Sequence, residues 1–114
     1  MSEKRVIEIP SFKLRDRTWE TFVLQNNGKN GIPDNDVPTV LLVSSVQLVA
    51  FHPEILPLLR FCMSRNCILR CPCSDAIRSM LQDLIISKMR EEGVLETAAI
   101  FFAEWALGEI IVTS

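Results

Sequence analysis

Residues 39–51, TVLLVSSVQLVAF, constrain the fold most, because they carry no charge and are mostly apolar. A strand with apolar side chains on both faces is typical of the centre of a sheet that is covered on both sides, and we expect such a strand here. A helix over the same residues is the main alternative. The uncharged run 37–53 is shorter than the roughly 20 residues that a membrane-spanning helix needs, so we expect no such span.

Residues 5–24 mix β-forming residues with alternating polarity, which predicts two or three short strands broken at Pro10 and at residues 15–17. Residues 26–38 are dense in Asn, Gly, Asp and Pro, the residues that favour turns. They predict a long polar loop, functional or mobile, rather than a tight hairpin.

The second half of the chain has helical signals. Pro57 is acceptable in the first turn of a helix and Pro72 forbids continuation, so a first helix is expected over residues 57–70. Ser74 is a suitable N-cap for a second helix, whose apolar residues recur every three or four positions before Gly93 ends it. A third helix is expected over residues 95–107, ended by Gly108 and followed by a short closing strand.

These segments predict an α+β fold. An N-terminal antiparallel β-sheet of three to four strands would pack against two or three C-terminal α-helices, in a single compact domain over residues 1–114. The composition is 48% hydrophobic and the mean hydropathy is +0.23. A small fold has too little interior to hide that much apolar surface, so part of it is expected to meet a partner or a second copy of the chain.

The third predicted helix is apolar around most of its circumference, which indicates central burial or docking on another molecule. Trp105 is the expected anchor, since aromatic residues dominate interface energetics. Ordinary core packing is the alternative for each residue. The expected partner contacts are Ile100, Phe101, Phe102, Trp105 and Leu107.

All four cysteines fall within residues 62–73, in the spacing C-x4-C-x3-C-x-C, which matches no strong zinc pattern. A chain break at Pro72 would allow Cys71 and Cys73 to join Cys67 around a zinc ion, with His52 completing the set. Burial of the cysteines as small hydrophobic residues is the alternative. Cys73 is the thiol expected to be most reactive, because it precedes the start of a helix.

The net charge is −2 and the pI is near 5.4, so nucleic-acid binding would need a local basic patch. Besides the arginines within residues 60–78, Lys13, Arg15 and Arg17 form a second basic cluster. Solvated surface is the alternative, because a five-residue spacing winds side chains around a helix instead of along one face. The expected phosphate-binding residues are Arg60, Arg65, Arg70 and Arg78.

No catalytic constellation or phosphate-binding glycine motif occurs in the sequence, so we predict no enzyme, no small-molecule substrate and no cofactor other than zinc. The N-terminus has neither a secretory nor a transit signature, which indicates a cytoplasmic or nuclear location. We predict a protein-interaction module, an adaptor, regulator or complex subunit that forms a homo-oligomer. The alternative is a nucleic-acid-binding regulator, zinc-assisted, by analogy with compact viral accessory proteins.

Overall fold

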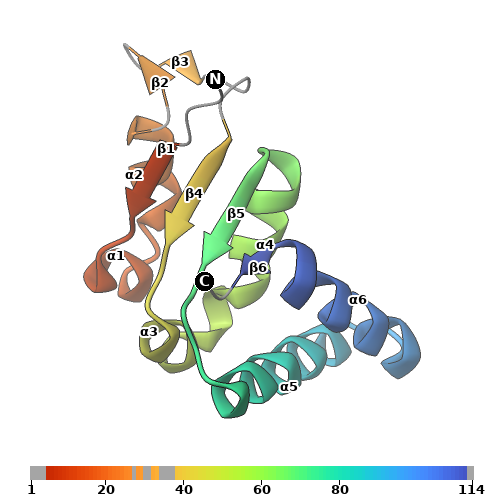
Figure 1. Ribbon diagram of the computed structural model, residues 1–114. Coiled ribbons are helices and arrows are strands. Elements are labelled where there is room, and N and C mark those ends of the chain that lie inside the picture. Colours follow the sequence, from red (N-terminus) through yellow and green to blue (C-terminus); the bar gives the residue numbers. More distant parts are fainter. Residues whose placement is uncertain (1–4, 27, 30–31, 34–37, 113–114) are drawn as a thin grey trace.

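The computed structural model describes residues 5–26, 28–29, 32–33 and 38–112. Its main sheet has four parallel strands in the order β1-β4-β5-β6. The prediction of an antiparallel, N-terminal sheet is therefore wrong in both respects, since the strands are parallel and distributed along the chain (Figure 1). The strands are β1 (Arg5–Glu8), β4 (Thr39–Leu42), β5 (Cys67–Arg70) and β6 (Ile111–Val112).

Helices connect each strand to the next, as parallel neighbours require, because a tight hairpin cannot return the chain to the same end of the sheet. A separate two-stranded antiparallel sheet pairs β2 (Gly28–Lys29) with β3 (Ile32–Pro33). After β1 come the helices α1 (Ser11–Arg15) and α2 (Trp19–Asn26). After β4 come α3 (Ser45–Ala50), the 3-10 turn η1 (His52–Glu54) and α4 (Ile55–Ser64). After β5 come α5 (Asp75–Glu91) and α6 (Glu96–Glu109).

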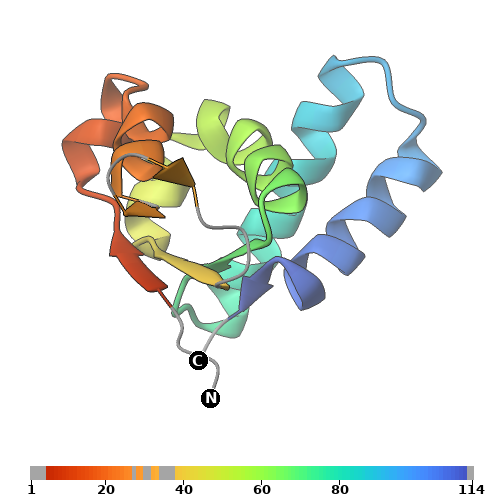
Figure 2. The same cartoon turned by 90° about the horizontal axis from the view of Figure 1, so that it is seen from above.

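The helices lie together on one side of the sheet, as Figure 2 shows. This follows from the strand order, because right-handed crossovers between strands that are neighbours in chain order all pass over the same face. The strand residues directed at the helices pair in register across the sheet and belong to the main core. They are Ile7, Leu41, Leu69 and Ile111. On the opposite face of the sheet, the exposed fraction rises from 1% for Val40 on the central strand β4 to 55% for Val6 on the edge strand β1.

Only the first part of the N-terminal segment forms a strand, so the prediction of two or three strands over residues 5–24 is wrong. Trp19 and Val23 are buried while Thr21 between them is exposed. A four-residue spacing of buried side chains belongs to a helix, and α2 forms there. Residues 19, 21 and 23 also fit the two-residue spacing of a strand. The packing of Trp19 and Val23 against the core favours the helix instead.

The apolar segment 39–51 contains both of the elements considered for it. Residues Thr39–Leu42 form the central strand β4, which is buried almost throughout. Ser44 then adopts an extended conformation as the N-cap of α3. The strand therefore ends where the two serines begin, and the remaining apolar residues pack as a short helix.

The predicted helix over residues 57–70 is wrong in its second half. α4 ends at Ser64, and Asn66 has a positive φ of 53°, a conformation that Asn adopts more readily than most residues. The chain then enters β5, where Cys67 and Leu69 are buried and Ile68 and Arg70 are half-buried. This period of two identifies a strand.

The second and third predicted helices are confirmed as α5 and α6. The backbone N–H of Ile77 donates to the Oγ of Ser74, 3.3 Å away, so Ser74 caps α5 as expected. Gly93, with a φ of +89°, follows the end of α5. α6 continues through Gly108 to Glu109, so the expected stop at Gly108 is wrong. No described helix is long and apolar enough to cross a membrane. Within the predicted loop 26–38, residues 28–29 and 32–33 form the antiparallel pair β2 and β3, so the expectation that this segment is not a tight hairpin is wrong. Residues 27, 30–31 and 34–37 lie outside the described residues.

Candidate interaction surface

α6 buries mainly alanines, together with Leu107, and leaves three large apolar residues exposed. Its buried residues are Ala99, Ala103, Ala106 and Leu107. Small side chains allow a helix to approach its neighbour closely, and α6 packs along α5 at one end of the sheet (Figure 1). Outside, Phe101 is 68% exposed, Trp105 is 46% exposed and Ile100 is 36% exposed. An ordinary amphipathic helix does the reverse, burying its large apolar residues.

The exposed aromatic residues lie on one stripe. Residues 101 and 105 are one turn apart and share a helix face. Ala98 and Gly108 are exposed and continue this stripe by three residues at either end. We call Ala98, Phe101, Trp105 and Gly108 the α6 stripe. A Cβ added at Gly108 would meet nothing within 4 Å, so the stripe ends in open space.

The five predicted partner contacts differ in their exposure. Ile100, Phe101 and Trp105 are exposed. Phe102 is half-buried, with its ring centroid 6.0 Å from that of Trp105, so it supports the stripe from below. Leu107 is only 4% exposed and belongs to the core. The sequence identified the helix, but it did not show which residues of the helix face outward.

The cysteines are mostly buried. Cys62 lies on α4, Cys67 on β5 and Cys71 just after β5, and all three are enclosed, while Cys73 is half-buried. Burial raises the pKa of the Cys62 thiol, and it raises the pKa of Cys71 to about 11. The Sγ of Cys67 donates to the carbonyl oxygen of Arg65 at 3.3 Å. This environment is that of small core side chains, not of reactive thiolates.

Zinc binding stays a prediction, because the described residues provide no set of ligands for the ion. In the described parts of the chain, no group of three or more His, Cys, Asp or Glu side chains is placed to hold a metal ion. His52 lies in η1, and the three cysteines proposed with it belong to β5 and the segment after it.

The four predicted phosphate-binding arginines are mostly engaged within the protein. Arg60 forms a two-pronged ion pair with Glu92, in which Nη1 is 3.1 Å from Oε2. Arg65 lies over the Phe61 ring at 5.6 Å, and Arg78 donates to the carbonyl oxygen of Leu107 at 2.7 Å. Arg70 is half-buried on β5. The contacts of Arg60 and Arg78 join α4 to the end of α5 and α5 to α6, so these two guanidinium groups already have partners within the fold.

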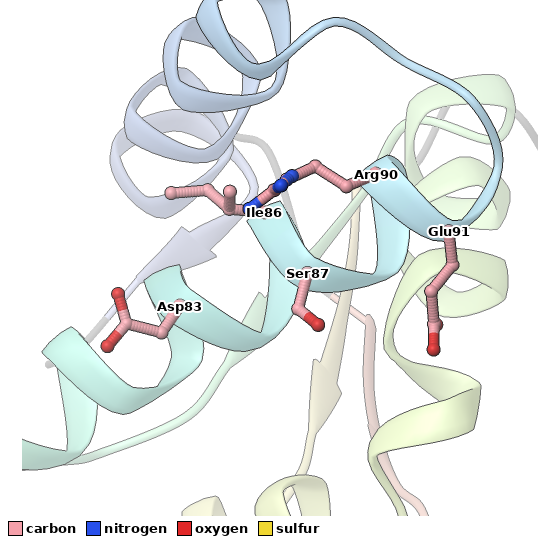
Figure 3. Close-up of a pocket in the computed structure, with 5 residues that line it drawn as sticks. All are labelled: Asp83, Ile86, Ser87, Arg90 and Glu91. Carbon is pink, nitrogen blue, oxygen red and sulfur yellow. The ribbon is translucent and has the colours of Figure 1, made fainter.

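One hollow, of about 530 Å³, lies along α5 and is lined by residues of that helix. Figure 3 shows that the side chains of Asp83, Ser87 and Glu91 point away from those of Ile86 and Arg90. Two of the charged groups are already paired, because Glu91 lies 3.1 Å from Lys88 and Arg90 lies 3.8 Å from Glu96. This hollow is therefore a solvated helix surface, not an enclosed site.

A second hollow, of about 390 Å³, lies at the carboxyl ends of β1 and β4, where parallel α/β sheets commonly bind ligands. Its polar side chains are those of Glu8, Ser11, Ser44 and Gln47. The sequence analysis missed this place because it expected an antiparallel sheet, which has no common carboxyl edge. The apolar run that ends in Ser44 was the signal that could have indicated it.

A third hollow, of about 340 Å³, lies between the end of α1 and η1 and gathers Arg15, Arg17, His52 and Glu54. The indole N–H of Trp19 donates to Oε1 of Glu54 at 2.7 Å, and the Nε of Arg17 lies 3.0 Å from Oε2. From the sequence, Arg15 and Arg17 were expected in a basic cluster with Lys13, and His52 was expected as a zinc ligand. The fold brings Arg15, Arg17 and His52 to one hollow.

Comparisons of the chain with protein-family models, with curated proteins and with solved structures found no match.

Proposed function

We propose that this protein is a protein-interaction module that associates with a second copy of itself through the α6 stripe. The observation that carries the proposal is the inverted packing of α6, which leaves Phe101 68% exposed and Trp105 46% exposed on one face. Exposed aromatic residues on adjacent turns are the composition that interface hot spots favour.

The stripe has the symmetry that a two-fold interface needs. In an isologous dimer, residue i of one copy contacts residue j of the other and the reverse contact repeats it. The stripe runs small, aromatic, aromatic, small, with spacings that are the same from either end. If two α6 helices pair antiparallel about Ala103, each Phe101 meets the partner's Trp105. Each Ala98 then meets the partner's Gly108, and these small residues allow the two backbones to approach.

The magnitudes favour a weak dimer. Removing the exposed parts of the Phe101 and Trp105 rings from water contributes about 5 kcal/mol per copy, at about 25 cal/mol per Å². Association costs roughly 4–15 kcal/mol in lost translational and rotational freedom and in side-chain ordering. The two copies together contribute about 10 kcal/mol, so only a cost of about 4–6 kcal/mol leaves a stable dimer, with a Kd of about 40 μM to 1 mM.

Charge supports a protein partner over nucleic acid. The charged residues of α6 are Glu96, Glu104 and Glu109, with no Lys or Arg among them. An acidic rim around an apolar stripe repels phosphates. In the antiparallel pairing Glu104 lies one residue from the centre and on the same side of the interface in both copies, so the two Glu104 side chains repel each other at the rim and weaken the dimer slightly, less so at high salt.

Sedimentation velocity over a range of protein concentrations tests the proposal. We expect the wild-type chain to dimerise reversibly and the double variant Phe101→Ser/Trp105→Ser to remain monomeric. The matched control is Phe12→Ser, because Phe12 is 60% exposed on α1, outside the stripe. It removes similar apolar surface and should leave the dimer unchanged.

Gly108→Gln is the sharper variant. A Cβ at this position meets nothing within 4 Å, and Gln is a better helix former than Gly, so folding should not suffer. In the dimer it would collide with Ala98 of the second copy and weaken association by about tenfold or more. A wild-type chain that stays monomeric at about 1 mM would overturn the proposal, given the affinity range above. So would a Gly108→Gln variant that dimerises as the wild type does.

A further inference from the structure

The hollow between α1 and η1 gathers three features that each cost free energy. Glu54 is a carboxylate with only 5% of its surface exposed. Arg17 has a φ of +64°, in the left-handed region that residues other than Gly seldom occupy. The Nδ1 of His52 is buried and has no hydrogen-bond partner among the described residues. Such departures gather where a site needs a fixed arrangement of groups.

Glu54 fixes the position of Arg17. Its two oxygens bind the indole N–H of Trp19 at 2.7 Å and the Nε of Arg17 at 3.0 Å. Trp19 is itself 3% exposed, so the carboxylate is anchored to the core. The terminal NH2 groups of Arg17 make no hydrogen bond to a described residue, and its side chain is 72% exposed. The guanidinium is therefore oriented from one side and available on the other.

Arg15 is also oriented and lacks an ionic partner in the described parts of the chain. Its guanidinium lies 5.7 Å from the centroid of the Phe51 ring, a cation–π contact that places it beside the hollow. The nearest other carboxylate along the chain, that of Asp16, accepts hydrogen bonds from the N–H and hydroxyl of Thr18 at 3.1 and 2.6 Å. The hollow thus presents two guanidinium groups and one imidazole around a single carboxylate that is already bonded.

We propose that this hollow binds a small oxyanion, a carboxylate or phosphate group, through Arg15, Arg17 and His52. Guanidinium groups bind such anions with paired, charge-assisted hydrogen bonds. The apolar walls formed by Leu14, Ala50 and Phe51 accept the organic body that carries the anion.

The two tryptophans provide the test. In ¹H–¹⁵N NMR spectra, the indole signal of Trp19 reports on the hollow through Glu54, and that of Trp105 on α6 is an internal reference. Inorganic phosphate and benzoate are titrated separately at constant ionic strength, with neutral benzamide as the uncharged analogue of benzoate. We expect a saturable shift of the Trp19 signal with at least one of the two anions and no saturable shift with benzamide.

Variants separate a site from a general charge effect. Arg15→Gln should weaken binding of the anion by about tenfold or more, and Arg15→Lys should restore part of it. Arg90→Gln makes the same charge change at an exposed position of α5 and should leave the affinity unchanged. Saturation with phosphate alone or with benzoate alone would support the site and identify its preferred anion. Shifts that stay linear with concentration, or that Arg15→Gln and Arg90→Gln alter equally, would overturn the proposal.

Discussion

The hydrogen bond between Trp19 and Glu54 predicts a large difference between the two tryptophans of this protein. Trp19 is 3% exposed, donates to a buried carboxylate at 2.7 Å and meets the edge of Phe61, with ring centroids 5.5 Å apart. Trp105 is 46% exposed. Substituting each by Phe keeps an aromatic ring and removes the indole N–H, so the two variants differ chiefly in what that group binds.

The expected cost of Trp19→Phe has two parts. Losing a hydrogen bond to a charged, buried acceptor costs about 1.5–3 kcal/mol. The smaller ring leaves a void that adds about 1 kcal/mol. The free energy of unfolding should therefore fall by about 3 kcal/mol. The ion pair of Glu54 with Arg17 adds little to this, because Arg17 is largely exposed and solvent screens the pair. Trp105→Phe should stay within about 0.5 kcal/mol of the wild type.

Urea unfolding followed by far-UV circular dichroism measures both variants without depending on tryptophan fluorescence. Low protein concentration keeps association out of the comparison. A double-mutant cycle measures the coupling, because in a Glu54→Leu background the indole N–H is already unpaired, and Trp19→Phe should then cost no more than the void, about 1 kcal/mol or less. A loss below about 0.5 kcal/mol for Trp19→Phe in the native background would refute the reasoning, since so small a loss is typical of surface changes.

Two further predictions follow from the pKa shifts. Because the pKa of Cys71 is raised to about 11, roughly one thiol in a thousand is ionised near pH 8, and the pKa values of Cys62 and Cys67 are also raised by burial. Iodoacetamide should therefore modify Cys73 first in the native protein, and peptide mass spectrometry that finds Cys71 modified equally fast would contradict this. The hydrogen bond from Arg60 lowers the pKa of Glu92 below its ordinary value of 4.5. The ion pair therefore stabilises the fold above pH 4.5, and this stabilisation is lost as the pH falls through the lowered pKa. Arg60→Gln should raise the pKa of Glu92 towards 4.5 in a ¹³C NMR titration, and an unchanged pKa would contradict the ion pair.

Helices with local signals were predictable from the sequence, and the sheet was not. α5 has a serine cap, a regular apolar period and a glycine after its end, and all three act within a few residues. The pairing of β1 with β4 is decided by packing across the whole fold. One local signal was available, because an apolar run such as residues 39–42 is typical of parallel strands, whereas antiparallel strands more often alternate.

The candidate sites were likewise predictable from the sequence only where a local pattern marks them. The apolar third helix drew attention to Phe101 and Trp105 from composition alone. Its outward face became evident only from the packing of Ala99 and Ala103 against the rest of the fold. The hollow between α1 and η1 joins residues 15–17 to residues 52–54, which no local pattern connects. Residues 67–70 were mistaken for helix because a short apolar segment satisfies either period until its neighbours choose one.

The order β1-β4-β5-β6 also determines how the sheet can come apart. Each strand pairs only with its neighbours in chain order, so no strand is inserted between two that precede it. β4 and β5 have a partner on both sides, whereas β1 and β6 each depend on a single neighbour. Local opening should therefore start at the outer strands and spare the central pair. The molecule can fray from either edge, one strand at a time, while the apolar centre of the sheet stays closed.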